Sequence, residues 1–514
     1  MFAHTVGSHC LGTAYATANQ VPNIIYDIVL GGALTSAIVP VLAGAAARRG
    51  RGPAEPAAAP AEPGADAEAS QIASALLTWA VVLLAPASLI IALAARPLAS
   101  LLLAGVPHCS QVAAVNVSSR MLAVFAPQIL LYGLAVVLYG ILQAHRRFTA
   151  PALAPVVSSL VVITAYLLYV PLAGGHQGSL ATIPWPAELM LSVGTTAGVA
   201  ALALTALGPA LRLRLRLRPT LRFPDGVARR VRALAAAGVA AFIAQDASLV
   251  AVIVLANGHQ GEGAVVLYNY GWQMFFVPYA VLAVPIATSA FPLLSAAAHG
   301  PEFDRTAAGA ARAAMLVSWL GAAMLAAAAL PAARLFVSHP EQVHQLALTF
   351  AAFAPGLVGF GLAAALSRVL FASGRNRATA VALVGGWLVV IAVDVAAVPH
   401  VPTRWVVPVL GLGNTIGLTC AGIALLAAVR GVRGTAALAG SARAAGAGLA
   451  GALAGGAAGA LVSARCHVAG FVPNAAVALL ACLCAAALFG VAALVLDGGD
   501  LRALVARTAG RWGR

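Results

Sequence analysis

Long apolar runs separated by short polar breaks dominate the chain. Most runs reach about 20 residues, the length that an α-helix needs to cross the hydrocarbon core of a membrane. The pattern predicts 13 spans, over 22–47, 72–95, 121–143, 150–173, 187–209, 233–256, 265–296, 313–333, 346–372, 378–399, 405–429, 444–463 and 471–496. It therefore indicates an all-α polytopic membrane protein with about 13–14 transmembrane helices.

Composition strengthens this reading. Of the 514 residues, 61% are hydrophobic and 9% are charged, whereas soluble proteins have roughly 45–50% apolar and 25% charged residues. The mean hydropathy is +0.94. These values exclude a soluble enzyme, a disordered chain and a nucleic-acid-binding domain.

Arginine sets the expected orientation. All 30 basic residues are arginines, and 24 of them fall in alternate breaks against 5 in the opposite set. Cytoplasmic loops of membrane proteins carry the excess of positive charge. The arginine-rich breaks and the tail at 497–514 are therefore predicted to be cytoplasmic, in a multi-pass membrane protein.

Three segments do not fit the pattern of spans. Residues 52–70 are rich in Pro, Ala and Glu, which predicts a disordered cytoplasmic loop. The run LRLRLRLRP at 211–219 alternates as a strand would, but its position between two spans favours a segment lying along anionic headgroups. Residues 1–20 are short and polar, while the first span must start outside. Either this polar tail is translocated or an additional upstream helix precedes it, and we favour the additional helix.

A duplication is the most informative feature. Residues 125–156 and 353–384 align without a gap at a shift of 228, with 14 of 32 positions identical. The third and ninth spans are six helices apart and run in the same direction, which indicates a parallel repeat of two six-helix units. Two lobes around a central cavity are typical of alternating-access transporters.

This repeat predicts the domain organisation. We expect a sequence of five parts, namely an N-terminal lobe at 1–210, a cytoplasmic basic linker at 211–232, a C-terminal lobe at 233–430, two extra transmembrane helices at 431–496 and the basic tail at 497–514.

Three segments resemble one family. The sequence VPNIIYDIVLGGALTSAIVPVL at 21–42, with Pro22-Asn23, Gly32-Ala33 and Pro40, is similar to the second-helix signature of the MurJ (MviN) lipid II flippases of the MOP superfamily. Residues 125–156 and 268–298 resemble that family's fourth-to-fifth and eighth helices. The Gly-Gly form of the first motif suggests the actinobacterial branch.

The resemblance implies a fold like that of MOP and MATE transporters and a role in peptidoglycan synthesis. It implies that the chain moves lipid II, an undecaprenyl-diphosphate-linked disaccharide-pentapeptide, from the cytoplasmic to the outer leaflet by alternating access. Membrane lipids and cell-wall synthesis proteins are the implied partners. A polar, cation-lined cavity would shield the head group from a core that penalises unpaired polar groups.

The sequence departs from the family at its charged positions. The family's acidic residue before Pro-Asn falls on Thr13, and its arginine pair after Pro-Asn falls on Tyr26 and Asp27. Its arginine in the eighth helix falls on Gln273. The resemblance therefore implies that Asn23, Tyr26, Asp27 and Gln273 line the cavity and that other residues supply its positive charge.

Charged residues near or inside spans supply further candidates. Arg368 either contacts substrate or snorkels to the cytoplasmic interface. Arg120 is either a gate residue or an interface anchor. Asp246, which follows Gln245 inside a span, is the candidate for ion coupling, and Asp394 is expected at an outer interface.

No catalytic site, cofactor or metal centre is predicted. Acidic residues of the outer breaks stand singly, histidines are scattered, and no phosphate-binding Gly-rich motif occurs. Most cysteines are expected to be small core residues, although Cys109 and Cys466 both fall in outer breaks and can form a disulfide. Two alternatives to lipid II transport stay open, namely another MOP-type flippase or drug exporter and a non-transporting scaffold for cell-wall enzymes.

Overall fold

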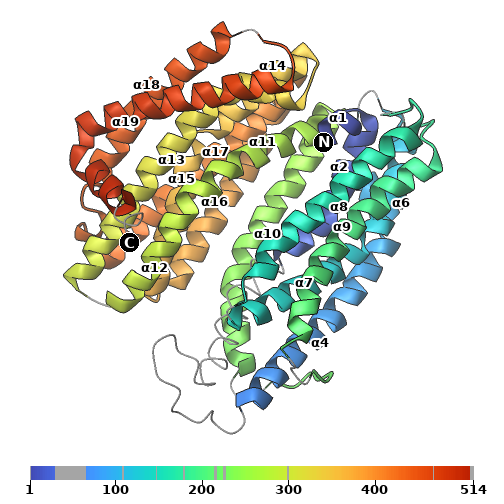
Figure 1. Ribbon diagram of the computed structural model, residues 1–514, viewed down its shortest axis with the longest axis horizontal. Coiled ribbons are helices and arrows are strands. Elements are labelled where there is room, and N and C mark those ends of the chain that lie inside the picture. The colour runs from blue at the N-terminus through green and yellow to red at the C-terminus, as the bar shows by residue number, and fades with distance from the viewer. Residues whose placement is uncertain are drawn as a thin grey trace. The chain divides into compact units, whose positions relative to one another are not determined.

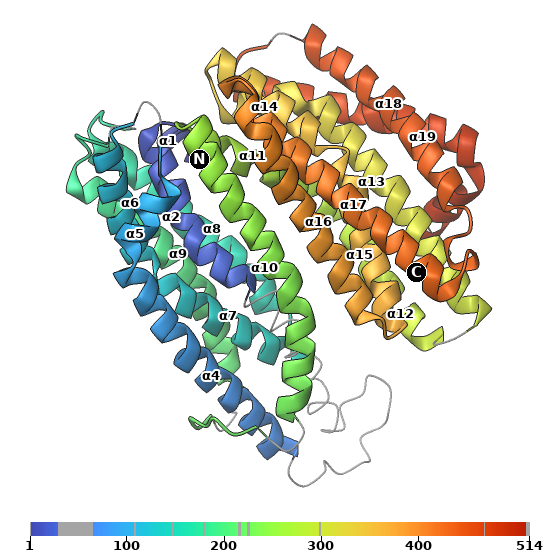
Figure 2. The ribbon, with the colours of Figure 1, turned by 180° about the vertical axis from the view of Figure 1, so that it is seen from behind.

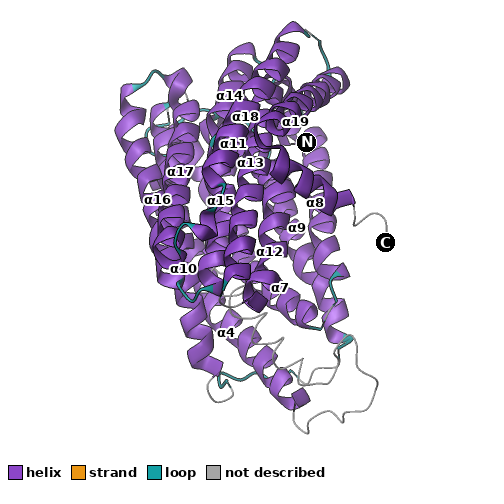
Figure 3. Ribbon diagram, turned by 90° about the vertical axis from the view of Figure 1, so that its left-hand side faces the viewer, coloured by secondary structure: helices purple, strands orange, loops and turns teal. Residues whose placement is uncertain are grey.

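The computed structural model describes residues 2–28, 65–106, 109–145, 147–177, 180–213, 217–223, 227–297, 300–466 and 468–509. Within these ranges the chain is helical and contains no strand (Figure 3). It divides into two compact units, Met1–Gly263 and Ala264–Arg514. Residues 52–64 of the predicted loop at 52–70 lie outside the described residues, as do Gly32, Ala33 and Pro40 of the family's second-helix motif. The prediction was wrong for residues 65–70, which already form the start of a helix.

The first unit is drawn from blue to green in Figure 1. Its helices are α1 (Phe2–Thr5), α2 (Cys10–Asp27), α4 (Ala65–Leu93), α5 (Ala95–Leu102), α6 (Gln111–Phe125), α7 (Pro127–Ala144), α8 (Thr149–Ala173), α9 (Trp185–Leu211) and α10 (Val227–His259). Helix α7 packs against α4 and α9, α8 packs against α9, and α2 packs against α6.

The second unit is drawn from yellow-green to red. Its helices are α11 (Ala264–Pro278), the π-helix η2 (Tyr279–Ala283), α12 (Val284–Ala297), α13 (Pro301–Phe336), α14 (Pro340–Phe353), α15 (Gly356–Ala372), α16 (Asn376–Ala397), the 3-10 turns η3 (Val398–His400) and η4 (Thr403–Trp405), α17 (Val406–Arg433), the 3-10 turn η5 (Ala436–Leu438), α18 (Ser441–Arg465) and α19 (Phe471–Ala509). Helix α17 packs against α15 and α16, and α18 and α19 both pack against α13.

The membrane-spanning helices confirm the predicted fold class. Among the described residues, 12 helices or helix pairs are long and apolar enough to cross a membrane. They correspond one to one with the predicted spans from 72–95 onward. The chain is therefore a multi-pass membrane protein.

Two predicted boundaries were wrong. The first span was expected at 22–47, but α2 already begins at Cys10. Residues Thr13 and Thr17 look too polar for a membrane helix in the sequence. In the structure they are buried and hydrogen-bonded, so they cost little in an apolar environment. The span predicted at 121–143 begins ten residues earlier, at Gln111.

The helix boundaries reproduce the sequence duplication. Phe125 ends α6 and Phe353 ends α14, while α7 ends at Ala144 and α15 ends at Ala372. Both pairs are separated by the same shift of 228 residues as the two repeat segments. Each copy therefore contains two consecutive helices separated by a short break, α6 and α7 in the first and α14 and α15 in the second. A short turn and a further helix, α8 or α16, follow.

Small residues allow the helices of the second unit to pack closely. A Cβ atom at Gly386 of α16 would lie 2.6 Å from the Cβ of Ala421 and 2.9 Å from the carbonyl oxygen of Gly417, both on α17. Close backbone approach through glycine is a common way for membrane helices to associate, since lipid supplies no hydrophobic driving force between them.

Candidate functional site

A polar and aromatic patch lies where α2 meets α7 in the first unit. It consists of Asn23, Tyr26 and Asp27 of α2 and Tyr132 of α7. The Tyr132 hydroxyl donates to the Asn23 side-chain oxygen at 3.2 Å, and the Tyr26 and Tyr132 rings lie 4.2 Å apart, centroid to centroid. All four side chains are half-buried. The patch therefore offers a carboxylate, an amide and two phenols on half-buried side chains, and Tyr132 contacts both the amide and the other phenol ring.

Three residues of this α2–α7 patch were predicted from the sequence. The fourth residue, Tyr132, was missed, because no residue near it in its own helix indicates that its hydroxyl has a polar partner. The signal was available in the repeat: Tyr132 falls inside the duplicated segment, on the helix that follows Pro127. The hydrogen bond from Tyr132 to Asn23 becomes apparent only from the packing of α7 against α2.

Asp246 of α10 is buried in the first unit with only 3% of its surface exposed. Neither of its carboxylate oxygens has a hydrogen-bond partner in the described part of the chain. An isolated buried carboxylate is unfavourable unless it is neutral or paired with a cation. A carboxyl group in this position is expected to be protonated or paired with a cation. The role of Asp246 in ion coupling stays a prediction.

The second unit carries Gln273 and Arg368 on different helices. Gln273 is exposed on α11, and Arg368 is half-buried on α15. The Arg368 Nη1 donates to the carbonyl oxygen of Ala364, one turn earlier in its own helix, at 2.6 Å. In the described residues no hydrogen bond joins Gln273 to Arg368. The choice between substrate contact and snorkelling for Arg368 stays a prediction.

Asp394 lies three residues before the end of α16, near the helix end where the sequence placed it. It is completely buried there, and its oxygens have no hydrogen-bond partner within the described ranges. The space for it comes from Gly413 of α17, because a Cβ there would overlap the Asp394 carboxylate. The next residue, Asn414, donates to the Tyr268 hydroxyl at 3.0 Å. The buried polar groups of Asp394, Asn414 and Tyr268 can be recognised only from the packing of α16 and α11 against α17.

Arg120 lies inside the span Gln111–Ala144, two turns and more from its start. Its Nε and Nη2 donate to the two carboxylate oxygens of Glu188 on α9, at 2.8 and 2.6 Å. The Glu188 side chain is only 4% exposed, and the guanidinium carbon lies 5.9 Å from the centre of the Trp185 ring. Arg120 therefore connects α6 to α9 inside the first unit. Its role as a gate stays a prediction.

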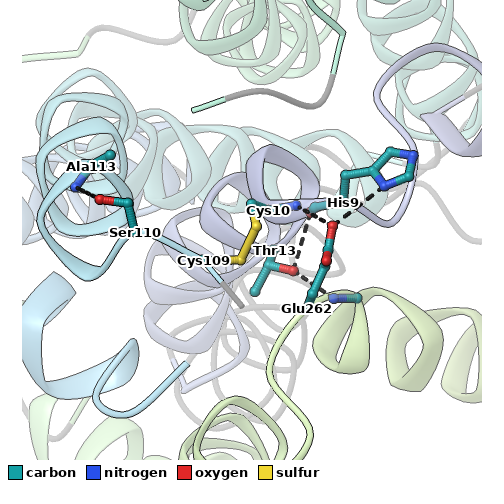
Figure 4. Close-up of a disulfide and its surroundings, with 8 residues drawn as sticks. His9, Cys10, Thr13, Cys109, Ser110, Ala113 and Glu262 are labelled. Atoms are coloured by element: carbon teal, nitrogen blue, oxygen red, sulfur yellow. Dashed lines mark hydrogen bonds and ion pairs between the residues drawn. A yellow bond between two sulfur atoms is a disulfide. The ribbon is translucent and has the colours of Figure 1, made fainter. Parts of the chain in front are cut away.

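Figure 4 shows the start of α2 held by three contacts within the first unit. Cys10 forms a disulfide with Cys109, and its backbone N–H donates to Glu262 at 3.1 Å. The N–H of Gly263 donates to the Thr13 hydroxyl oxygen at 2.7 Å. Thr13 thus supplies an acceptor at the position where the resemblance implies an acid.

The disulfide differs from the predicted one. Cys109 pairs with Cys10 rather than with Cys466, which is free. Cys10 was missed because the boundary error placed it in a polar tail instead of at the start of a helix. Cys10, Cys109 and Glu262 come close enough to suggest metal ligands, but two of the three are sulfurs bonded to each other.

Counting accessible thiols tests this pairing. The chain has six cysteines, of which four are free. Unfolding in detergent without reductant, followed by maleimide labelling, should therefore add four labels, and prior reduction should raise the number to six. Cys109→Ser is expected to give five labels with or without reduction. Six labels on the unreduced wild-type chain would contradict the disulfide.

Comparison with known proteins supports the resemblance seen in the sequence. Residues 2–480 match the family described as "Lipid II flippase MurJ". The lipid II flippase MurJ of Burkholderia cenocepacia is 26% identical over 300 residues, which cover 58% of this chain and 53% of that protein. The aligned part thus spans about half the length of this curated relative.

Two solved structures share the fold. A structure described as lipid II flippase MurJ in an inward closed conformation has a TM-score of 0.68 and 16% identity, covering 95% of this chain and 94% of that one. An inward-facing MATE family multidrug resistance transporter of the MOP superfamily has a TM-score of 0.65 and 16% identity, covering 85% and 93%. The family match extends over more than nine-tenths of the sequence, so the chain belongs to the lipid II flippase MurJ family.

Proposed function

We propose that the protein is a flippase for lipid II in a bacterial plasma membrane. The observation that carries the proposal is the family match over residues 2–480 together with a MurJ-like fold over nearly the whole chain. The head group of such a lipid is large and polar, and it cannot cross the hydrocarbon core without partners for its polar groups. Alternating access would supply those partners while the polyprenyl tail stays in lipid.

The distribution of arginines supports the direction of transport. The arginine-rich breaks and the C-terminal tail would lie in the cytoplasm, and the Cys10–Cys109 disulfide would lie outside, in the compartment where disulfides persist. The substrate would enter from the cytoplasmic leaflet. The predicted division into an N-terminal lobe, a basic linker, a C-terminal lobe and two extra helices belongs to this proposal.

The polar residues have distinct proposed roles. The α2–α7 patch would bind the head group through its amide, carboxylate and phenol groups. Gln273 and Arg368 of the second unit would contact the head group or its diphosphate. Asp246 would couple transport to a proton or cation, because it is buried without a hydrogen-bond partner. No step requires a catalytic residue or a cofactor.

Depletion and rescue in cells test the proposed function. Cells depleted of the protein should lose outer-leaflet lipid II, measured with a membrane-impermeant reagent that modifies the head group, and the chain should restore it. Asp246→Asn is expected to insert normally and to restore little, because the amide takes up no proton near neutral pH and has no negative charge to balance a cation. Glu341→Gln, an exposed acid on α14, serves as the matched control and should restore fully.

The alternatives predict other outcomes. Unchanged lipid II exposure on depletion, with mislocalised cell-wall enzymes, would indicate a scaffold. Unchanged exposure with increased sensitivity to cationic drugs would indicate an exporter. Either result would contradict the flippase proposal.

A further inference from the structure

The basic linker after α9 is partly described, and its residues 217–223 are bound to a neighbouring helix. Residues 217–223 form no helix, and they lie beside the N-terminal half of α4 in both Figure 1 and Figure 2. We call residues 217–223 the strap. The backbone N–H groups of Arg218 and Thr220 donate to the hydroxyls of Ser74 and Thr78 at 3.0 and 3.1 Å. The indole N–H of Trp79 donates to the carbonyl oxygen of Leu221 at 3.1 Å.

Apolar side chains near both ends of the strap pack against the first unit. Leu213, just before it, and Phe223, its last residue, pack against the cluster that α4 and α7 form around Ile72 and Ile141. Side chains of α4 satisfy backbone groups of the strap. This is what a non-helical chain needs near the membrane, since lipid offers no hydrogen-bond partners.

The strap lies at the boundary between protein and lipid. Helix α4 spans the membrane from Ser70 to Leu93. Only 11% of the residues in the most apolar stretch of this span are buried inside the protein. All four strap contacts with α4, including the one from Gln71 to the carbonyl of Arg222, fall within the first three turns of that span. The arginine distribution assigns this end of α4 to the cytoplasmic side.

The strap exposes a mixture of apolar and cationic side chains. Leu217 and Leu221 are 42% and 51% exposed, and Trp79 beside them is 36% exposed. Arg212, Arg218 and Arg222 are exposed as well, and in the described residues no ion pair involves them. Over residues 211–223 the sequence has five arginines and no acid. Leucine and tryptophan favour the acyl boundary, while arginine reaches the phosphates above it.

We propose that the strap and the preceding Arg212 form a binding surface for anionic phospholipid headgroups of the cytoplasmic leaflet. Hydrogen bonds to α4 hold the backbone of the strap at the cytoplasmic end of that helix, which places its exposed arginines at the level of the headgroups, and the neighbouring leucines set their depth. The inference is independent of the transported substrate, because binding of bulk phospholipid is measured without any translocation.

Lipid exchange on the full chain tests the proposal. The protein is reconstituted in phosphatidylcholine vesicles or in vesicles of phosphatidylcholine with an equal part of phosphatidylglycerol. Retained phosphatidylglycerol is then counted by native mass spectrometry. Removing the three charges in Arg212→Gln/Arg218→Gln/Arg222→Gln should lower the relative affinity for phosphatidylglycerol on the order of 100-fold, about fivefold per arginine. Added salt should weaken wild-type retention in the same direction.

The matched control removes the same charge elsewhere. Arg375→Gln/Arg377→Gln/Arg430→Gln takes three exposed arginines from the predicted cytoplasmic side of the second unit and should leave retention nearly unchanged. A second variant, Ser74→Ala/Thr78→Val, keeps every arginine but removes both hydroxyls that hold the strap, and retention should fall partially. An equal fall in the strap and control triple variants would overturn the proposal, since net charge alone would then explain binding. So would unchanged phosphatidylglycerol retention with a selective loss of an added polyprenyl diphosphate.

Discussion

Replacing Arg120 with methionine is expected to destabilise the first unit by about 3 kcal/mol, because it leaves the buried Glu188 carboxylate without a partner. Removing one member of a buried ion pair typically costs about 3–5 kcal/mol. We expect the lower end, since the Arg120 side chain is itself 46% exposed while that of Glu188 is only 4% exposed. Thermal unfolding in detergent, followed by the loss of helical signal, measures the effect.

Two further variants identify the cause. Arg120→Met/Glu188→Met replaces the whole pair with apolar side chains and should recover most of the stability, as buried pairs often tolerate such replacement. Arg96→Met removes an exposed arginine from α5 of the same unit and should change stability little. If the double variant were as unstable as Arg120→Met, the lost packing of the arginine rather than the orphaned carboxylate would be responsible.

Gly359→Ala is expected to disrupt the contact between α15 and α17. A Cβ at Gly359 would overlap backbone atoms of Leu418 and Thr419, which cannot rotate away as a flexible side chain can. The helices must therefore separate, and overpacking of this kind costs about 1–3 kcal/mol or more. Because Gly422 also lies against Gly359, the separation would extend along α17. The unfolding temperature of the purified protein measures the loss.

The chain offers a close control for this substitution. Gly385 lies in α16, and a Cβ there would meet nothing within 4 Å. Gly385→Ala should therefore be neutral or stabilise the protein by up to about 1 kcal/mol, the difference in helix propensity between the two residues. Equal effects of the two substitutions would show that α15 and α17 do not approach as closely as described.

The sequence predicted the fold well because membrane helices leave a simple signal. Apolar runs of fixed length and alternating arginine content identify spans without any knowledge of their packing. The apolar runs placed the ends of the two repeated helices at 143 and 372, within one residue of the observed ends at Ala144 and Ala372. Errors occurred where polar residues lie inside helices, as at Thr13 and Arg120. Their partners come from distant parts of the chain, so a local reading counts them as breaks.

The candidate site was harder to predict for the same physical reason. Asn23, Tyr26 and Asp27 share a motif, but Tyr132 joins them only through the packing of α7 on α2. Asp394 has no polar neighbour in sequence, and its burial depends on the missing side chain of Gly413. Pairwise contacts between helices decide such positions, and neither hydropathy nor spacing encodes them.

The disulfide also has a consequence for the biogenesis of the protein. Cys10 and Cys109 are 99 residues apart in the sequence, and ribosomes add about 5–20 residues per second. At this rate, synthesis of the intervening chain takes roughly 5–20 s. During this time Cys10 has not yet met Cys109 and remains a thiol. Among the cysteines of the predicted outer side, Cys109 emerges next and Cys466 last. Because the chain is made from its N-terminus, Cys109 becomes available to Cys10 before Cys466 does. A pause in translation between the codons of Cys10 and Cys109 would lengthen the time for which the Cys10 thiol is exposed to other oxidants.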